Sequence, residues 1–250
     1  MIKTILHGCS GRMGHIITEI CEKDEKIENV AGVDAFGSAY AGYPVFRTLD
    51  ECPEADVIID FSNSSAIDGL LEYSVRKNVP AVVCTTGLSE EQLSALDKAS
   101  EKTAILKSAN MSVGINLLEA LIAEAAPKLA AAGFDIEIVE KHHNQKVDAP
   151  SGTALALADA ANAALGGEYE YVYDRTVRRM KRPEKEIGIS AVRGGSIVGD
   201  HDVIFAGQDE VITFSHRAYS RAVFGKGAVE AAKFLAGKES GFYTMSDVLK

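Results

Sequence analysis

The sequence lacks an excess of positive charge, and it also lacks any long apolar run. It contains 26 Lys and Arg residues against 36 Asp and Glu residues, which gives a formal net charge of −10. Nucleic acids and anionic membranes attract proteins through a basic surface, so we expect neither as a partner. The most apolar stretch, 120–134, is broken by charged residues and a proline, so it predicts no membrane span. A small molecule is therefore the expected partner.

Cysteine is scarce and is not arranged in C-x-x-C pairs. The four cysteines, Cys9, Cys21, Cys52 and Cys84, all lie in the first third of the chain. This spacing argues against a zinc ribbon and against the disulfide framework of a small secreted protein. The first apolar run also lacks the layout of a signal peptide. We therefore expect reduced thiols and a cytoplasmic protein.

What is present is the composition of a folded protein. Of the 250 residues, 46% are hydrophobic and 25% are charged, which is ordinary for a globular chain. A chain of this length can form one large core or two smaller ones, and we favour two domains.

The first part of the chain has the pattern of a βαβ unit. An apolar run at 4–7 precedes a glycine-rich turn at 8–14, and a helical pattern over 13–20 follows. A second apolar run covers 27–33 and is followed by Asp34. This length and order are those expected of strand, helix and parallel strand.

The glycines of the turn indicate a dinucleotide site. Gly8, Gly11 and Gly14 would let the backbone approach a pyrophosphate at the helix N-terminus, where free N–H groups favour anions. Asp34 stands where a carboxylate can bind the ribose hydroxyls. The alternative is a merely tight turn between strand and helix.

Further strands and helices alternate up to about residue 110. Apolar runs at 57–61, 81–85 and 105–108 predict buried parallel strands, and 67–77 has a helical pattern. This alternation predicts a doubly wound α/β sheet. Small polar residues that follow such strands can bind ligands at the sheet edge, although loop or helix-cap roles are equally consistent. The two candidates are Asp60-Phe61-Ser62 and Thr85-Thr86-Gly87.

The pattern changes from Val113 onward. The later strands follow one another without intervening helices, which predicts a second, α+β domain with a mixed sheet. The expected elements are a helix at 113–132, a strand at 135–140, a helix at 153–165, and strands at 187–192, 203–206 and 211–214.

The segment from Glu137 to Ala154 is the richest in reactive side chains. His142, His143 and Lys146 directly follow a predicted strand, and Ser151-Gly152-Thr153 begins a predicted helix. The histidines and lysine can donate protons, and the helix start offers N–H groups and hydroxyls to an anion such as a carboxylate. The sequence therefore places a proton donor beside an anion site.

A metal site and a solvated polar loop are the competing interpretations of His142 and His143. Adjacent residues on an extended chain point to opposite sides, and the nearby carboxylates do not form a further ligand pair. We therefore expect no metal. The loop interpretation leaves the serine, glycine and threonine at the helix start unexplained.

These residues resemble a known family, the 4-hydroxy-tetrahydrodipicolinate reductases (dihydrodipicolinate reductases) of bacterial lysine and diaminopimelate synthesis. Residues 137–154 resemble its signature without a gap. The resemblance spans essentially the whole chain, through Gly11-Arg12-Met13-Gly14, Asp60-Phe61-Ser62, Thr85-Thr86-Gly87, 109–114, 192–201 and 238–241.

The resemblance implies an enzyme with two domains. A Rossmann-like dinucleotide-binding domain would comprise 1–112 completed by 222–250, and a domain for substrate binding and tetramerisation would comprise 113–221. It implies reduction of the cyclic dicarboxylate 4-hydroxy-tetrahydrodipicolinate to tetrahydrodipicolinate with NADH, NADPH or both. The expected assembly is a homotetramer formed through the C-terminal sheet.

The resemblance also implies roles for individual residues. His142 matches the general acid, and Lys146 matches a second proton donor that contacts the substrate. The substrate-binding residues would be His143, Lys146, Ser151, Gly152 and Thr153. The cofactor-binding residues would be Gly8, Gly11, Arg12, Met13, Asp34, Thr85, Thr86, Gly87, Ala109, Asn110 and Met111.

Two features depart from the family pattern. Ala35 and Phe36 follow Asp34, where several relatives carry a basic residue. Since Asp34 would repel a 2′-phosphate, we expect NADH to serve at least as well as NADPH. The stretch 175–185 contains six basic residues, for which a solvated or intersubunit loop is favoured over a patch that steers an anionic substrate.

Two other functions are consistent with part of the sequence. Another dinucleotide-dependent dehydrogenase of an amino or keto acid would share the glycine turn, but it has no need of the 137–154 segment. A non-catalytic dinucleotide sensor would be expected to carry a DNA-binding or partner-binding appendage, and the sequence shows no such segment.

Overall fold

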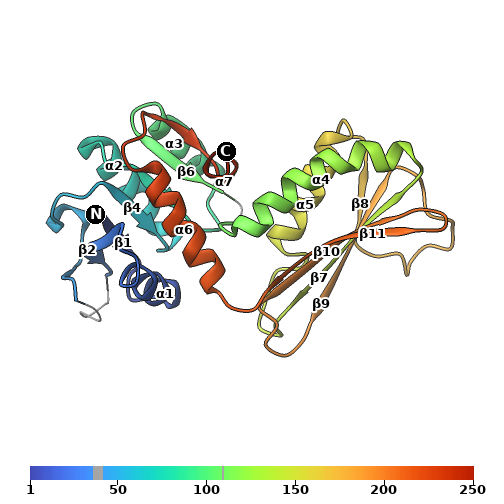
Figure 1. Cartoon of the computed structure of the whole chain (residues 1–250), viewed down its shortest axis with the longest axis horizontal. Coiled ribbons are helices and arrows are strands. Elements are labelled where there is room, and N and C mark those ends of the chain that lie inside the picture. Colours follow the sequence, from blue (N-terminus) through green and yellow to red (C-terminus); the bar gives the residue numbers. More distant parts are fainter. Residues whose placement is uncertain (36–41, 109) are drawn as a thin grey trace. The chain divides into compact units, whose positions relative to one another are not determined.

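The computed structural model of the chain describes residues 1–35, 42–108 and 110–250. Phe36, named above as a departure from the family pattern, and Ala109, predicted to bind the cofactor, lie outside the described residues. The chain divides into two compact units, one formed by 1–113 together with 221–250 and the other by 114–220. Each unit contains one sheet (Figure 1). The predicted combination of a doubly wound parallel sheet and a mixed sheet is confirmed.

The first unit is built on a seven-stranded sheet in which every strand pair is parallel. The strand order is β12-β6-β5-β4-β1-β2-β3. The chain therefore runs outward in both directions from β1 and β4, and their carboxyl ends lie at the switch point where such sheets bind ligands. The strands are β1 (Ile2–His7), β2 (Ile27–Val33), β3 (Val45–Phe46), β4 (Val57–Asp60), β5 (Ala81–Val83), β6 (Ala104–Lys107) and β12 (Gly241–Tyr243).

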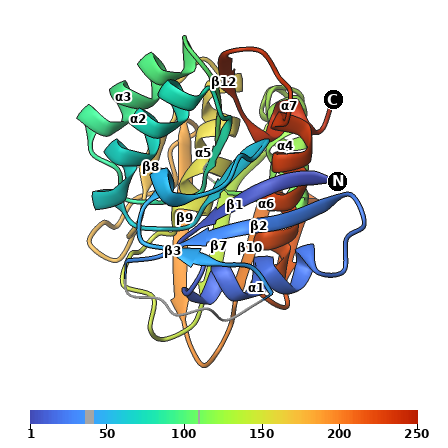
Figure 2. The same cartoon turned by 90° about the vertical axis from the view of Figure 1, so that its left-hand side faces the viewer.

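Helices cover both faces of this sheet. Successive residues of a strand point to opposite faces, so neighbouring strand residues pack under different helices. Leu6 and Ile59 pack in the core beneath α1 and α6, whereas Ile5 and Ile58 pack beneath α2 and α3. Figure 2 shows these two pairs of helices on opposite sides of the sheet. The helices are α1 (Arg12–Cys21), α2 (Ile67–Lys77), α3 (Glu90–Ser100), α6 (Ala222–Leu235) and α7 (Met245–Val248), with short 3₁₀ turns at Leu49–Glu51 and Ser64–Ala66.

The C-terminal segment belongs to the first unit through close backbone contact. A Cβ atom at Gly227 of α6 would lie 1.6 Å from the carbonyl oxygen of Met111. A Cβ atom at Gly225 would lie 2.9 Å from Cδ1 of Ile20 in α1. These two glycines let α6 pack directly on α1 and on the Met111 backbone.

The second unit is a five-stranded mixed sheet with the order β11-β10-β7-β9-β8. β10 is antiparallel to β7 and β11, whereas β9 is parallel to β7 and β8. The strands are β7 (Asp135–His142), β8 (Glu170–Val172), β9 (Glu186–Arg193), β10 (Gly199–Ala206) and β11 (Val211–Ala218).

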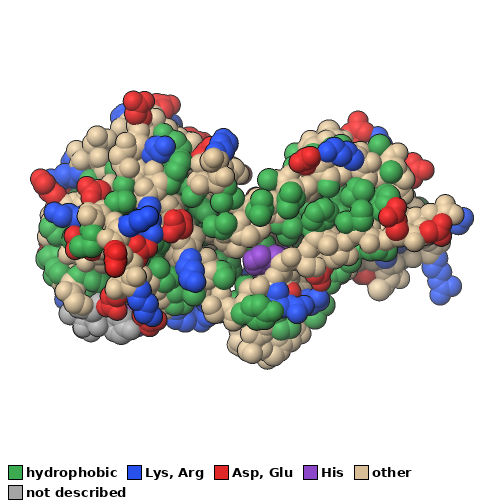
Figure 3. Space-filling model, in the orientation of Figure 1, with side chains coloured by type: hydrophobic (Ala, Val, Ile, Leu, Met, Phe, Trp, Pro, Cys, Tyr) green, Lys and Arg blue, Asp and Glu red, His purple; other side chains and the backbone are tan. Residues whose placement is uncertain are grey.

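Two helices, α4 (Val113–Ala131) and α5 (Gly152–Ala164), cover one face of the second sheet. Ile122 and Leu157 of these helices pack against Ile138 and Phe205 of the sheet. The outer side of α4 also carries exposed apolar residues such as Leu117, which gather over this helix in Figure 3. Among the described residues, no helix combines the length and apolarity needed to cross a bilayer.

The basic stretch 175–185 is held against the second sheet by ion pairs. Arg175 and Arg178 both pair with Glu186, whose side chain is 2% exposed. Arg182 bonds to Asp135 at 2.7 Å and to Glu137 at 3.0 Å. Much of the positive charge is therefore neutralised within the unit, which argues against a substrate-steering patch.

Candidate functional site

The glycine turn after β1 has a backbone that other residues could not adopt. Gly8 has a φ of +81°, and a Cβ atom there would lie 2.5 Å from the carbonyl oxygen of Phe61. A Cβ atom at Gly14 would lie 2.2 Å from the carbonyl oxygen of Cys9. The absence of both side chains thus permits the sharp turn into α1.

The N-terminus of α1 has the features of an anion site. Gly11 is its N-cap residue and provides no side chain to cap the first N–H groups of the helix. Such N–H groups and the helix dipole favour a phosphate. Arg12, also predicted to bind the cofactor, is exposed in the first turn, next to the half-buried Met13. The donor set fits the pyrophosphate of a dinucleotide.

Asp34 follows β2 beside the glycine turn. Its Oδ2 accepts a hydrogen bond of 3.3 Å from the backbone N–H of Ser10. Gly8 and Asp34 line the same cavity, which measures about 360 Å³. The structure therefore brings the predicted pyrophosphate and ribose residues together.

The next strands end in a row of polar side chains at the same sheet edge. His7, Asp60 and Lys107 are the last residues of β1, β4 and β6. Nδ1 of His7 lies 3.0 Å from Oδ1 of the fully buried Asp60. Burial raises the pKa of Asp60, but His7 and nearby hydroxyls outweigh it and hold that pKa below its usual value.

The predicted loop Thr85-Thr86-Gly87 lies directly beyond β5. The Nζ atom of Lys107 donates a hydrogen bond of 3.0 Å to the carbonyl oxygen of Thr85, which ties the loop to β6. Gly87 has a φ of +70°, a conformation that favours glycine. Asn110 accepts a hydrogen bond of 2.8 Å from the backbone N–H of Ser112, and Met111 is buried. These predicted residues therefore all belong to the first unit.

The second unit contains a buried histidine–carboxylate pair. Glu140 and His142 are two residues apart on β7, so both side chains point to the same face. Nδ1 of His142 lies 2.6 Å from Oε2 of Glu140. This contact orients the imidazole and leaves its Nε2 atom for another partner.

Glu140 is fully buried, and both oxygens of its carboxylate form hydrogen bonds. Arg193 donates to its two oxygens from Nη1 and Nη2, each at 2.7 Å, and the backbone N–H of Ser151 donates at 3.0 Å. Burial raises the pKa of Glu140, but the hydrogen bonds from Arg193 and His142 outweigh it, and the pKa lies below its usual value. Glu140 is therefore a carboxylate that fixes three neighbouring groups.

The space beside His142 is limited by a glycine and a second histidine. A Cβ atom at Gly199 would lie 3.0 Å from Nε2 of His142. The ring of His201 meets that of His142 edge to face, with centroids 5.1 Å apart. Burial lowers the pKa of His142, and the charges of Lys146 and Arg193 lower it further, against the opposing effect of Glu140.

The predicted anion-binding turn begins α5, and its members have different surroundings. Ser151 is 2% exposed, its Oγ accepts from the backbone N–H of Ala154, and the same Oγ lies 2.9 Å from Nε2 of His201. Ser151 therefore positions the turn through its side chain, and its predicted contact with the substrate stays a prediction. Gly152 is exposed, with no atom within 4 Å of an added Cβ, and Thr153 is half-buried.

His143 and Lys146 lie in the loop after β7. His143 is half-buried. Nζ of Lys146 lies 2.9 Å from Oδ1 of Asp148, which holds the pKa of Asp148 below its usual value. Within the described part of the chain, no three His, Cys, Asp or Glu residues form a group suited to a metal ion.

Sequence reasoning missed three residues of this centre, namely Glu140, Arg193 and His201. All three lie in segments that carry the family resemblance, but no role was predicted for them. The strand register explains their proximity, because Glu140 is paired with His201 and His142 with Arg193. The available signal was Glu140, a charged residue that follows Ile136 and Ile138 at every second position on the apolar face of the predicted strand.

The parallel sheet with its glycine turn, joined to a unit with a histidine–carboxylate centre, defines a dinucleotide-dependent oxidoreductase of the Rossmann class. Two family models together cover nearly the whole chain. The model "Dihydrodipicolinate reductase, N-terminus" matches residues 2–111, and "Dihydrodipicolinate reductase, C-terminus" matches 114–249. The chain belongs to the dihydrodipicolinate reductase family.

Individual relatives agree with this assignment. A 4-hydroxy-tetrahydrodipicolinate reductase of Caldanaerobacter subterraneus subsp. tengcongensis is 53% identical over 100% of this chain and 99% of its own length. One from Clostridium novyi is 48% identical with the same coverage. A dipicolinate-bound dihydrodipicolinate reductase from Paenisporosarcina sp. TG-14 has a TM-score of 0.79 at 25% identity, covering 98% of this chain and 97% of that one.

The family predicted from the sequence is thus confirmed, and the chain is an NAD(P)H-dependent oxidoreductase. The predicted function, reduction of 4-hydroxy-tetrahydrodipicolinate in lysine and diaminopimelate biosynthesis, is confirmed at the level of the family. A probable dehydrogenase from Thermotoga maritima has a TM-score of 0.63 at 13% identity, a likeness that concerns the fold alone.

Proposed function

We propose that this chain reduces 4-hydroxy-tetrahydrodipicolinate to tetrahydrodipicolinate with His142 as the proton donor. The overall reaction takes one NAD(P)H and one proton and releases NAD(P)⁺ and water. The observation that carries the proposal is the His142–Glu140 contact beside the exposed start of α5. When bound, the nicotinamide supplies the hydride, and the protein must supply the proton.

The two units would divide the binding tasks. In the first unit, the N–H groups at the start of α1 bind the pyrophosphate, and Asp34 binds the ribose hydroxyls. The loops 85–87 and 110–111 contribute the rest of the cofactor contacts. The second unit binds the cyclic dicarboxylate. Ala109 is retained from the sequence prediction, although it lies outside the described residues.

His142 would be charged by the arrival of the substrate. Its pKa is lowered from 6.5 in the free protein, so at neutral pH the ring is mostly uncharged, with its Nδ1 proton directed to Glu140. A dianionic substrate nearby favours the imidazolium form and so raises this pKa. Nε2 then carries the proton that is passed to the substrate.

The substrate carboxylates would bind at the start of α5 and in the loop after β7. The exposed Gly152 leaves its backbone N–H open to an anion, and the Thr153 hydroxyl lies in the same turn. His143 and Lys146 supply further donors. Lys146 would exchange its contact with Asp148, whose side chain is 61% exposed, for the substrate.

We further infer a homotetramer formed through the second sheet. The face opposite α4 and α5 bears Val192 and Val211, which are 45% and 62% exposed. The same face carries the ion pairs Lys141–Asp202 and Arg217–Asp200. A mixed apolar and charged sheet face of this kind suits association with other copies of the chain. Light scattering should give the mass of four chains, and a monomer at micromolar concentration would contradict the proposal.

The reaction is tested directly by cofactor oxidation. The purified full chain should oxidise NADH or NADPH only when enzymatically generated 4-hydroxy-tetrahydrodipicolinate is present. The His142→Gln variant should bind the cofactor normally and turn over slowly. Absence of oxidation by folded wild-type protein with both cofactors would overturn the proposal.

The net charge of −10 and the reduced thiols support a cytoplasmic enzyme without nucleic-acid or membrane partners.

A further inference from the structure

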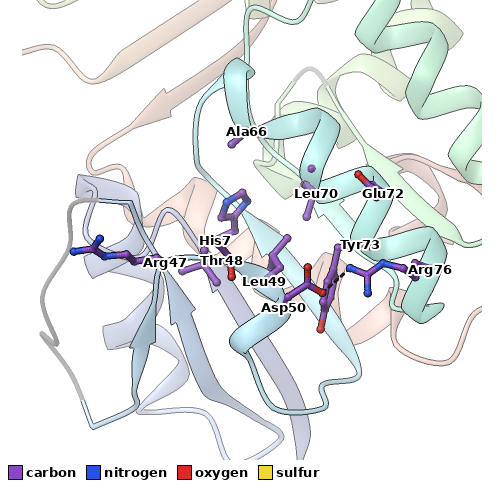
Figure 4. A pocket seen from close by; sticks show the side chains of 12 residues that line it. His7, Arg47, Thr48, Leu49, Asp50, Ala66, Leu70, Glu72, Tyr73 and Arg76 are labelled. Atoms are coloured by element: carbon purple, nitrogen blue, oxygen red, sulfur yellow. Dashed lines mark hydrogen bonds and ion pairs between the residues drawn. The ribbon is translucent and has the colours of Figure 1, made fainter.

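Arg47 lines the ribose end of the proposed dinucleotide site, although the sequence pattern predicts no basic side chain at that place. Arg47 is distant in sequence from the glycine turn, yet it borders the same cavity of about 360 Å³ as Gly8, Asp34 and Ala35. It also borders the adjoining cavity shown in Figure 4. Arg12, the basic residue that the sequence predicted to bind the cofactor, lines neither cavity.

The strand register explains why Arg47 is beside Asp34. β3 pairs in parallel with β2, with Val33 opposite Phe46. The backbone N–H of Asp34 continues the ladder by donating to the carbonyl oxygen of Phe46 at 3.0 Å. The next residue of each strand, Asp34 on β2 and Arg47 on β3, therefore leaves the sheet at the same place.

The Arg47 guanidinium is available to a ligand. The side chain is exposed, and within the described residues it forms no ion pair. Glu51, four residues further along the chain, accepts instead from the backbone N–H groups of Arg47 and Thr48 and from the Thr48 hydroxyl. By contrast, Arg76 on the far side of the adjoining cavity is paired with Asp50 at 2.5 Å. Figure 4 shows Arg47 extending away from that pair, on the other side of His7.

This arrangement has a consequence for the choice of cofactor. Asp34 suits the ribose hydroxyls of NADH and repels a phosphate on the 2′-oxygen. A guanidinium next to it can form a paired, charge-assisted hydrogen bond to that phosphate, which is the chemistry for which arginine is best suited. We infer that Arg47 recognises the adenosine 2′-phosphate of NADPH, so that the chain uses NADPH as well as NADH despite Asp34. The inference rests on the dinucleotide site of the proposed function, and it supplies the cation that residues 35 and 36 do not provide.

Binding measurements on the full chain test this inference without the substrate. Fluorescence titration of Arg47→Gln should show a loss of NADPH affinity of roughly tenfold or more, with NADH affinity changed less than about threefold. The same contrast should appear between adenosine 2′,5′-bisphosphate, which carries the 2′-phosphate, and ADP, which does not. Added salt should weaken NADPH binding to wild type more steeply than binding to the variant.

Arg76→Gln is the matched control, because it removes an arginine from the neighbouring cavity without touching Asp34. It should leave the ratio of NADPH to NADH affinity unchanged. If Arg47→Gln lost affinity for NADPH and NADH equally, Arg47 would only maintain the shape of the site. If its affinity for NADPH did not fall, another cation would bind the 2′-phosphate. Both outcomes overturn the inference. Because turnover is not measured, a failure here is distinct from a failure of the proposed reaction.

Discussion

Nδ1 of His142 lies 2.6 Å from Oε2 of Glu140, a carboxylate that is fully buried and also bonded to both terminal nitrogens of Arg193. The contact fixes the ring and favours the protonated form of His142, against the burial that disfavours it. In the proposed reaction Glu140 would therefore be a positioning residue that acts through His142 and influences the pH at which His142 carries a proton.

The first prediction concerns the pH dependence of this pair. The proposed reaction requires the protonated form of His142, and the pKa of His142 lies below 6.5 in the free protein. We therefore expect kcat/KM to fall as the pH rises through that pKa. Replacing Glu140 by Gln removes the charge that favours imidazolium, so the falling limb should move to lower pH. Profiles of kcat/KM against pH for both proteins check this.

A purely structural role of Glu140 would give a different result. In that case Glu140→Gln would lower kcat/KM by the same factor at every pH, without displacing the limb. Thermal unfolding of the variant separates loss of fold from loss of protonation.

The second prediction concerns the two proposed proton donors. His142→Gln and Lys146→Ala should each lower turnover by roughly 10²-fold or more, the usual range for loss of a general acid. Dinucleotide affinity should stay near that of wild type, because both residues lie in the second unit and the glycine turn lies in the first. Steady-state kinetics and cofactor titration measure the two effects.

The matched control for these variants is Gln145→Ala, which changes an exposed residue of the same loop. It should leave turnover unchanged. If His142→Gln and Lys146→Ala weakened cofactor binding as much as turnover, their roles would be structural.

The limits of sequence prediction are clear in particular elements. The expected strand 27–33 and helix 67–77 have the observed bounds, because their apolar periodicity ends where the elements end. The strand expected at 203–206 begins instead at Gly199, since the buried polar residues Asp200 and His201 continue the ladder with β7. Hydrophobic pattern does not reveal a strand end of that kind.

The same reasoning explains which residues of the candidate site could be predicted from the sequence. Those in short contiguous segments, such as Gly8 and His142, could be found from local spacing and family resemblance. Arg193 and Arg47 lie beside residues far away in the sequence, and their proximity depends on strand pairing. The strand β3 that positions Arg47 has only two residues, too few for a periodic signal.

The third prediction separates the roles of Thr153 and Ser151. Thr153→Val removes a hydroxyl at nearly constant volume. If Thr153 binds a substrate carboxylate, kcat/KM should fall by an amount that corresponds to a loss of about 1 to 3 kcal/mol of transition-state binding. The Tm should change little. Ser151→Ala removes a buried helix cap, so it should lower stability by about 1 kcal/mol. Unchanged kcat/KM in Thr153→Val would show that Thr153 only begins the helix.

The last prediction is that His201 makes the second unit sensitive to acid. Its side chain is buried, its Nε2 lies 2.9 Å from Oγ of Ser151, and burial together with the charge of His142 lowers its pKa to about 4. An unfolded chain would protonate this histidine near pH 6.5. Its contribution to stability is therefore full above that pH and is lost as the pH falls from 6.5 toward 4, by on the order of 3 kcal/mol.

Urea unfolding of the full chain at pH 7.5 and pH 4.5 measures this loss. His201→Gln cannot be protonated, so its free energy of unfolding should fall less between the two pH values than that of wild type. A smaller decrease should persist in the variant, because the pKa of His142 is also lowered by burial and contributes with the same sign. If wild type and His201→Gln lost the same stability on acidification, the acid sensitivity would have to reside in other groups.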